Sequence, residues 1–208
     1  MARSKDPLTA ATTSILKPGL ESAGFVKLSQ RVFVRLRSPV VQHVSVSLSC
    51  WGGNRFRVCY SSMPLFVPTT NFTLMLGGWF PRDGHENGVW SKKHHEVADK
   101  AMNSVLHEFR SGILPWFDRT DSIDSLVPLL TTMGYNPKGP RELELGACHA
   151  WLGDLDNAKA ALTFDGGNDV ARSFCETLLS AIESGTHHTL LNEWYADTVQ
   201  SLKIESLL

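Results

Sequence analysis

Several features that would assign a cellular location or a redox role are missing from this 208-residue sequence. No apolar run approaches the roughly 18 residues of a membrane-spanning helix, and Met1 to Pro7 is not followed by the apolar stretch of a secretion signal. The four cysteines form no C-x-x-C pair, and a chain of this length does not need disulfides to stabilise it. We therefore expect a cytoplasmic protein with reduced thiols and no membrane association.

Sequence signatures of common catalytic sites are missing as well. There is no G-x-S-x-G motif, and the glycine pairs at 52–53 and 77–78 do not belong to either common phosphate-binding loop pattern. Cys148 and His149 are adjacent, but neighbouring side chains on a helix diverge by about 100°, so they cannot face each other as nucleophile and base. These absences favour a protein without an enzymatic reaction and without a cofactor.

One histidine cluster keeps a catalytic interpretation open. His95 and Asp99 are four residues apart and would share one face of a helix, with His94 beside them. Metal sites use such spacing, but the second histidine of H-E-x-x-H is missing and no third ligand is evident. The cluster indicates either a small metal-dependent hydrolase or the solvated first turn of a helix, and we favour the second interpretation.

Charge is distributed very unevenly along a chain whose net charge is only -1. Residues 1–62 contain nine Lys or Arg against two Asp or Glu, whereas residues 118–208 contain fourteen acidic and six basic residues. Such asymmetry suggests either that the two halves dock on each other or that each offers a charged surface to a partner.

Residues 25–80 predict an antiparallel meander of four strands, because apolar and polar residues alternate in four segments. In the segment around Val32 and Val34, the alternation sets an apolar face against a face that collects arginines. That basic face could bind nucleic acid or an acidic ligand, or it could simply be solvated. Its five members are Arg31, Arg35, Arg37, Arg55 and Arg57.

Helical patterns flank this sheet. Asp6 and Pro7 predict a helix start. Residues 81–91 are glycine-rich and polar and predict a linker, and a period of 3.6 residues returns beyond residue 91. Two helical hairpins are expected near the C-terminus, one turning at 152–154 and one pairing 170–183 with 187–202. We therefore predict an α+β fold, a four-stranded meander packed by helices and followed by a helical-hairpin region. The chain would form either two domains, residues 1–90 and 91–208, or one compact unit.

The predicted C-terminal helices carry many acidic residues. Acidic helical surfaces are often only solvated, but they can also hold a basic partner by charge complementarity. The candidate residues for such a partner-binding surface are Asp154, Asp156, Asp165, Asp169, Glu176 and Glu183.

Two resemblances bear on function. The stretch A-W-L-G-D-L-D-N-A, which starts at Ala150, resembles the second half of a tetratricopeptide-type repeat. Together with L-K-P-G-L-E-S-A-G-F-V-K, the V-x-V-x-L strand and L-P-W-F, it also resembles a bacterial family of uncharacterised domains over about the first 165 residues. That resemblance implies a helix, a strand meander and further helices, and it supplies no catalytic residues.

From these observations we expect a non-enzymatic protein-binding module. By analogy with proteins that neutralise nucleic-acid-cutting toxins through acidic surfaces, its partner would be a basic protein such as a toxin, which would make the chain an immunity-type protein.

Overall fold

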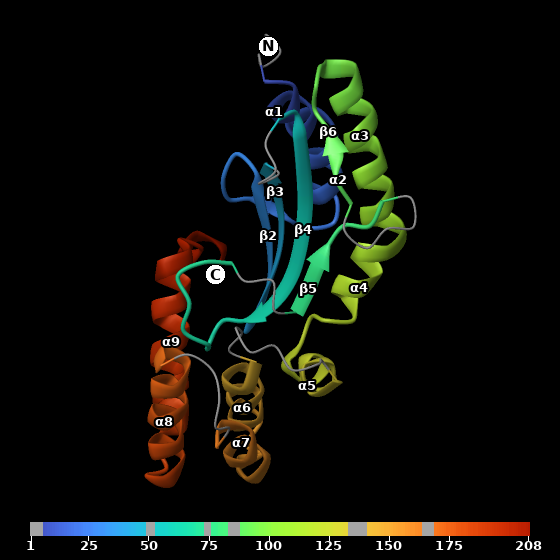
Figure 1. Cartoon of the computed structure of the whole chain (residues 1–208). Helices are drawn as coiled ribbons and strands as arrows, with labels where there is room; N and C mark the ends of the chain where they lie inside the picture. The colour runs from blue at the N-terminus through green and yellow to red at the C-terminus, as the bar shows by residue number, and fades with distance from the viewer. Residues whose placement is uncertain (1–5, 49–52, 73–75, 83–87, 133–140, 164–168) are drawn as a thin grey trace. The chain divides into compact units, whose positions relative to one another are not determined.

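The computed structural model describes residues 6–48, 53–72, 76–82, 88–132, 141–163 and 169–208 (Figure 1). The chain forms two compact units that interleave in sequence. Unit 1 comprises residues 1–36, 42–62 and 77–119, and unit 2 comprises residues 37–41, 63–76 and 120–208. The predicted α+β class is confirmed, whereas the units do not follow a single boundary near residue 90.

The described residues form one antiparallel sheet, as predicted, but with six strands instead of four. Their order is β1-β2-β3-β4-β5, and β6 also pairs with β4. Residues 26–37 form a hairpin of two strands, β1 and β2, and its turn is closed by the Leu28 N–H, which donates to the Val32 carbonyl at 2.9 Å. Residues 90–91, predicted as linker, form β6. The strands are β1 Val26–Lys27, β2 Val32–Arg37, β3 Val40–Leu48, β4 Arg55–Pro64, β5 Leu76–Trp79 and β6 Trp90–Ser91.

Unit 1 contains two helical rods, and each has a π-helical turn near a proline. The first is α1 Pro7–Ala11, a π segment Thr12–Leu16 and α2 Lys17–Glu21. The second is α3 His95–Glu108, a π segment Phe109–Ile113 and α4 Leu114–Asp118. Pro18 and Pro115 lack an N–H and crowd the preceding turn, and a wider π turn accommodates this without ending the rod.

The core of unit 1 lies between these rods and one face of the sheet. Gly19 lets the rods approach closely, since a Cβ built there would lie 2.3 Å from a methyl carbon of Leu106. The core residues are buried and mostly large: Leu8, Ala11, Leu16, Leu20, Phe25, Phe33, Val44, Val46, Phe56, Val58, Phe80, Trp90, Ala98, Met102, Val105, Phe109, Ile113 and Phe117.

The structure does not follow the predicted division of β2 into an apolar face and an arginine face. Phe33 belongs to the unit 1 core, and the Arg35 side chain is buried with it, only 5% exposed. Val34, on the other side of the strand, is also fully buried. Both faces of β2 are therefore buried, and the alternation of arginine with valine could not indicate which face meets the helices.

Unit 2 is mainly helical. It contains α5 Ile123–Thr132, α6 Arg141–Trp151, α7 Leu155–Leu162, α8 Asp169–Glu183, α9 His187–Leu202 and a terminal 3-10 turn Glu205–Leu207. The helices α8 and α9 begin and end within one residue of the predicted bounds. Gly146 on α6 lets α7 pack against it, because a Cβ there would lie 2.4 Å from Leu162 Cγ. No described helix is long and apolar enough to cross a membrane.

The two units differ strongly in charge. Unit 1 contains fourteen Lys or Arg and eight Asp or Glu, whereas unit 2 contains six basic and thirteen acidic residues. The net charges are therefore +6 and -7 with neutral histidines. The charge asymmetry of the sequence thus follows the division of the fold.

Candidate partner-binding surface

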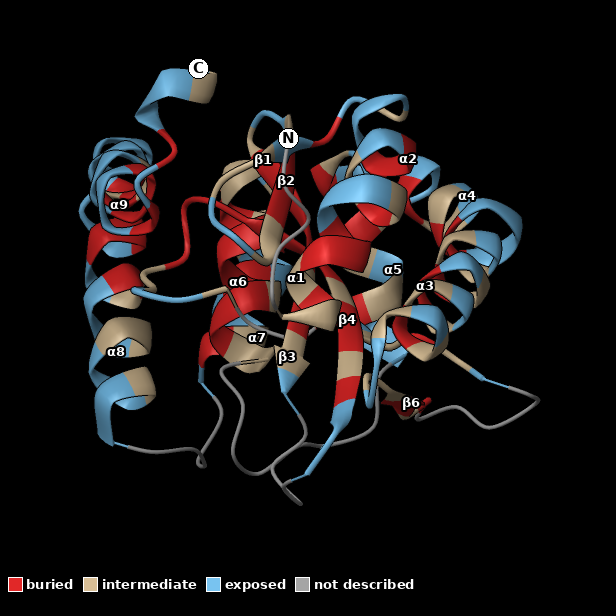
Figure 2. Ribbon diagram, turned by 90° about the horizontal axis from the view of Figure 1, so that it is seen from above, coloured by how far each residue is buried: buried red, intermediate tan, exposed pale blue. Residues whose placement is uncertain are grey.

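Three of the predicted acidic residues form a stripe along α8. Asp169, Glu176 and Glu183 are seven residues apart, which places them along one side of a helix. All three are exposed, and helical spacing places them opposite the buried residues Leu178 and Ile182. Figure 2 colours most of α8 as exposed or intermediate. Among the described residues, the stripe has one ion pair. It is a long contact between Asp169 Oδ1 and Arg172 Nη1, at 3.9 Å.

Asp154 has a structural role that distinguishes it from this stripe. It is the N-cap of α7, and its Oδ2 accepts a hydrogen bond from the Asn157 side chain at 2.8 Å. The side-chain hydrogen bond from Asn157 is the leading cause that lowers its pKa, and His149, 3.1 Å away, also lowers it. Asp156 is exposed on α7, and Asp165 lies outside the described residues.

A hollow of about 430 Å³ lies in unit 2 beside the first turns of α8 and the last turns of α9, and we call it the α8–α9 hollow. Its most unusual residue is Val170, which is 66% exposed although it is a large apolar side chain. Phe174, half-buried, lies one turn further along the same helix. The hollow is lined by Pro68, Thr69, Thr70, Val170, Phe174, Asp197, Thr198 and Ser201.

Buried contacts fix the walls of the hollow. Thr198, 1% exposed, donates a hydrogen bond to the Val67 carbonyl at 3.2 Å, which anchors the segment that leads to Pro68. Phe174 packs edge-to-face on Trp194, with ring centroids 5.5 Å apart, so α8 and α9 hold each other in place here (Figure 1). The hollow is thus formed by side chains that the core of unit 2 positions.

The electrostatics of the hollow are acidic. Asp197 lines it, Glu193 lies one turn before Asp197 on α9, and Asp169 precedes Val170 on α8. Among the described residues none of the lining side chains is basic. An exposed apolar patch with acidic neighbours suits a partner segment that combines apolar and basic side chains.

Comparisons with protein-family models, curated proteins and solved structures found no match.

The five predicted arginines do not form one exposed surface. Arg35 is buried, and Arg31 is paired with Asp6, with 3.2 Å between Nη2 and Oδ2. Arg57 is half-buried with its guanidinium 5.2 Å from the centroid of the Trp79 ring. Only Arg37 and Arg55 of this set are exposed, which removes most of the predicted contact face for nucleic acid.

The histidine cluster lies where the sequence predicts it, at the beginning of α3. His94 is exposed at the N-cap, and His95 and Asp99 are half-buried in the first turns of the helix. Over the described ranges of the chain, no group of three His, Cys, Asp or Glu side chains is close enough to hold a metal ion.

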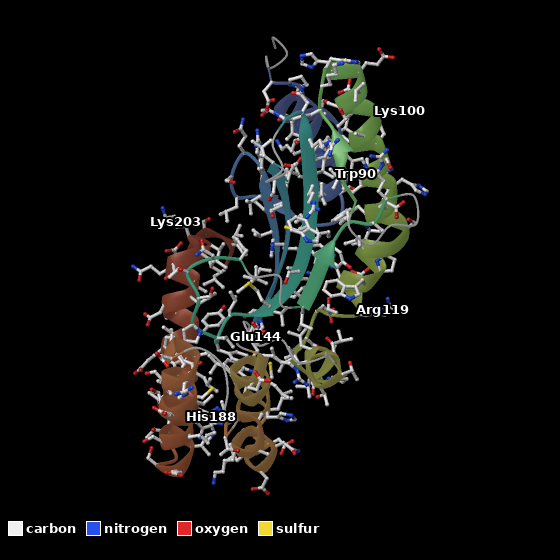
Figure 3. The ribbon with its side chains drawn as sticks, in the orientation of Figure 1. Trp90, Lys100, Arg119, Glu144, His188 and Lys203 are labelled. Carbon is white, nitrogen blue, oxygen red and sulfur yellow. The ribbon has the colours of Figure 1, made fainter. Side chains whose placement is uncertain are left out.

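Sequence reasoning missed the residues that shape the hollow and one buried acid. The sequence pattern predicts only a helix over 170–183, and it does not mark Val170 or Phe174 as part of a surface hollow. Glu144 on α6 is 3% exposed, and burial raises its pKa to about 8 (Figure 3). Its Oε2 has no hydrogen-bond partner among the described residues, and no sequence pattern marked it as buried.

Proposed function

We propose that this chain is a non-enzymatic protein-binding module that holds a basic, partly apolar segment of another protein on unit 2. The observation that carries the proposal is the α8–α9 hollow, where Val170 is exposed beside Asp197. A single exposed valine is ordinary on a protein surface, but here it borders a hollow in a unit with a net charge of -7.

Two further features support a basic partner. The acidic stripe of α8 adds three exposed carboxylates on the same helix as Val170, which would steer a positively charged protein towards the hollow. The partner class that fits this chemistry is a basic protein such as a toxin, so that binding would neutralise it. A hydrolase is less well supported, because the α3 histidine cluster gathers no third metal ligand among the described residues. A nucleic-acid-binding protein is also less well supported, because only two of the five arginines of the sheet are exposed.

The test is affinity capture from the source cell with the full chain, followed by mass spectrometry and by titration with the purified partner. Val170→Asp and Asp197→Lys should each weaken binding by about tenfold or more, because they remove the apolar contact or reverse the charge beside it. Glu96→Lys is the matched control, since it makes the same change of charge on an exposed helical position of unit 1.

The proposal is wrong if no basic protein is captured, or if Asp197→Lys binds the partner as tightly as Glu96→Lys does. Toxin neutralisation is tested separately by co-expression. If the captured partner does not impair growth when it is expressed without this chain, the chain is a protein-binding module that does not neutralise a toxin.

A further inference from the structure

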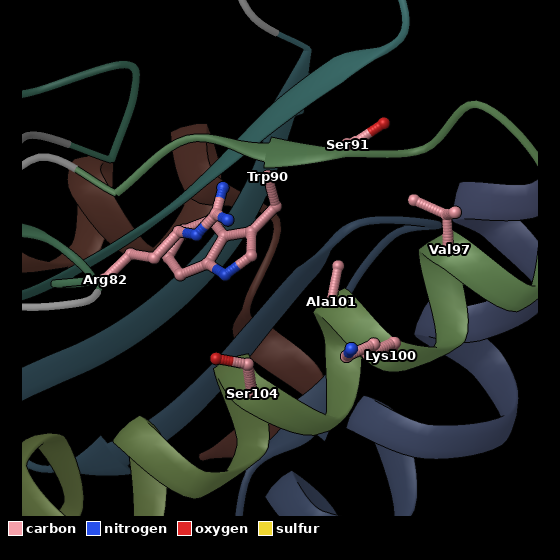
Figure 4. A pocket seen from close by; sticks show the side chains of 7 residues that line it. All are labelled: Arg82, Trp90, Ser91, Val97, Lys100, Ala101 and Ser104. Atoms are coloured by element: carbon pink, nitrogen blue, oxygen red, sulfur yellow. The ribbon is translucent and has the colours of Figure 1, made fainter.

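A second hollow, in unit 1, has a chemistry opposite to that of the α8–α9 hollow. It has a volume of about 440 Å³ and lies between β6 and α3, and we call it the β6–α3 pocket (Figure 4). Such a volume is within the range of small-molecule sites. Its lining contains two cationic side chains and the Ser104 hydroxyl, and it has no carboxylate among the described residues. The lining residues are Arg82, Trp90, Ser91, Val97, Lys100, Ala101 and Ser104.

Trp90 supplies a buried hydrogen-bond donor without a partner. The side chain is 2% exposed, and its Nε1 has no hydrogen-bond acceptor within the described residues. A buried tryptophan N–H usually has an acceptor, so an unpaired one in a pocket wall is free to donate to a group that enters the pocket. Figure 4 shows the nitrogen edge of the indole and the Ser104 hydroxyl facing the same space.

The position of this indole is firmly fixed. Trp90 pairs with Phe56 across β6 and β4, and the two rings stack with centroids 5.9 Å apart. Gly88 closes on the far edge of the ring, because a Cβ there would lie 2.6 Å from Trp90 Cη2. The indole therefore cannot easily turn its N–H towards another acceptor, and the donor remains directed at the pocket.

The positive charge comes from two different elements. Lys100 is exposed on α3 and has no ion-pair partner in the part of the chain that the structure describes. Arg82, which follows β5, donates a hydrogen bond from Nη1 to the Val89 carbonyl, and this contact holds its side chain beside the indole. Val97 and Ala101 add an apolar wall.

We propose that the β6–α3 pocket binds a small molecule that carries a phosphate group, with its organic part against the apolar wall. Lysine, arginine, a hydroxyl and an indole N–H can all donate to the oxygens of one tetrahedral anion. The pocket is larger than a phosphate group alone requires, so a phosphate ester fits it better than inorganic phosphate. This site is independent of the partner-binding surface, because all of its residues belong to unit 1.

The proposal is tested by isothermal titration calorimetry of the full chain with phenyl phosphate, inorganic phosphate and benzoate. We expect phenyl phosphate to bind most tightly, since it combines the tetrahedral anion with an apolar group. Lys100→Met should weaken its binding by about tenfold or more, the effect of losing one charge-assisted hydrogen bond. Trp90→Phe keeps the ring and removes the N–H, and it should weaken binding by about two- to tenfold.

Lys93→Met is the matched control, because Lys93 is exposed near the pocket but does not line it. Circular dichroism spectra and melting curves of each variant check that the fold is retained. Equal losses in Lys100→Met and Lys93→Met would show a diffuse attraction to surface charge and would overturn the proposal. No binding of phenyl phosphate to the natural chain, or binding no tighter than that of benzoate, would overturn it as well.

Discussion

Arg35 is a charged side chain that is almost completely buried. Its Nε donates to Gln42 Oε1 at 2.7 Å, its Nη1 to the Ala23 carbonyl at 3.2 Å and its Nη2 to Asp118 at 2.9 Å. The guanidinium also lies 5.1 Å from the centroid of the Phe25 ring. Because the Asp118 side chain is 60% exposed, solvent screens that ion pair, and the buried neutral acceptors and the ring contribute most of the stabilisation.

Arg35→Ala should therefore lower the free energy of unfolding by about 3 kcal/mol, measured by urea denaturation. The loss comes from a cavity and from the buried amide and carbonyl oxygens left without a donor. Arg55→Ala, at an exposed position of β4, should change the stability by no more than about 0.5 kcal/mol. Equal effects of the two substitutions would contradict the buried role of Arg35.

Glu144 gives the folded protein a pH dependence of its own. Burial raises its pKa from the ordinary 4.5 to about 8, so the folded chain keeps this proton at neutral pH while the unfolded chain releases it. Rising pH between those two values therefore favours unfolding. The destabilisation grows from pH 4.5 upwards and is complete above pH 8.

Glu144→Gln should remove that slope. Relative to the natural chain, the variant should be more stable at pH 8, by on the order of 3 kcal/mol, and equally stable near pH 4.5. Chemical denaturation at several pH values measures the difference, and Glu176→Gln on the exposed side of α8 is the control. A stability difference that does not change with pH would contradict the prediction.

The contact between α6 and α7 depends on a missing side chain. Gly146 packs on Leu162, and both lie in the unit 2 hairpin that turns at the left-handed Gly153, whose φ is +80°. Gly146→Ala should destabilise the protein by about 1–3 kcal/mol, because Leu162 must shift in a closely packed interface. Gly112→Ala is the control, since a Cβ at Gly112 meets nothing within 4 Å and alanine favours the helix. Thermal unfolding of the two variants makes the comparison.

The helices were predictable to a greater extent than the strands. Local signals fix the ends of a helix, such as the capping Asp6, whose Oδ2 accepts from the Thr9 N–H at 3.1 Å, or the turn at Gly153. Strand pairing and the choice of the buried face depend on residues far away in sequence. Arg35 illustrates this, because Asp118, 83 residues further along the chain, is needed to explain its position.

The two candidate binding sites were predictable only in part. The acidic stripe on α8 follows from sequence spacing, because residues seven apart share one side of any helix. The β6–α3 pocket required the fold, since its cations come from Arg82 and Lys100 and its donor from Trp90, in a segment that sequence reasoning assigned to a linker. Loops and short strands carry little periodic signal, so a site built from them appears only in three dimensions.

At the scale of the whole molecule, the two units have separate cores but share strands. β3 contributes Val44 and Val46 to the unit 1 core and Val40 to the unit 2 core. β4 likewise begins in unit 1 and ends in unit 2, at Pro64. If one unit unfolds, β3 and β4 lose their partners there, and the core of the other unit loses the support of these strands. We therefore expect the two cores to unfold together.

A single cooperative transition should therefore appear in calorimetry, with equal calorimetric and van't Hoff enthalpies. Phe109→Ala in the unit 1 core and Leu178→Ala in the unit 2 core should each lower the free energy of that same transition by about 2–5 kcal/mol. Independent units would instead give two transitions, and each substitution would shift only one of them. We expect a single transition because β3 and β4 contribute to both cores. The opposite net charges of the units suggest two separate binding roles, but separate roles do not require separate unfolding.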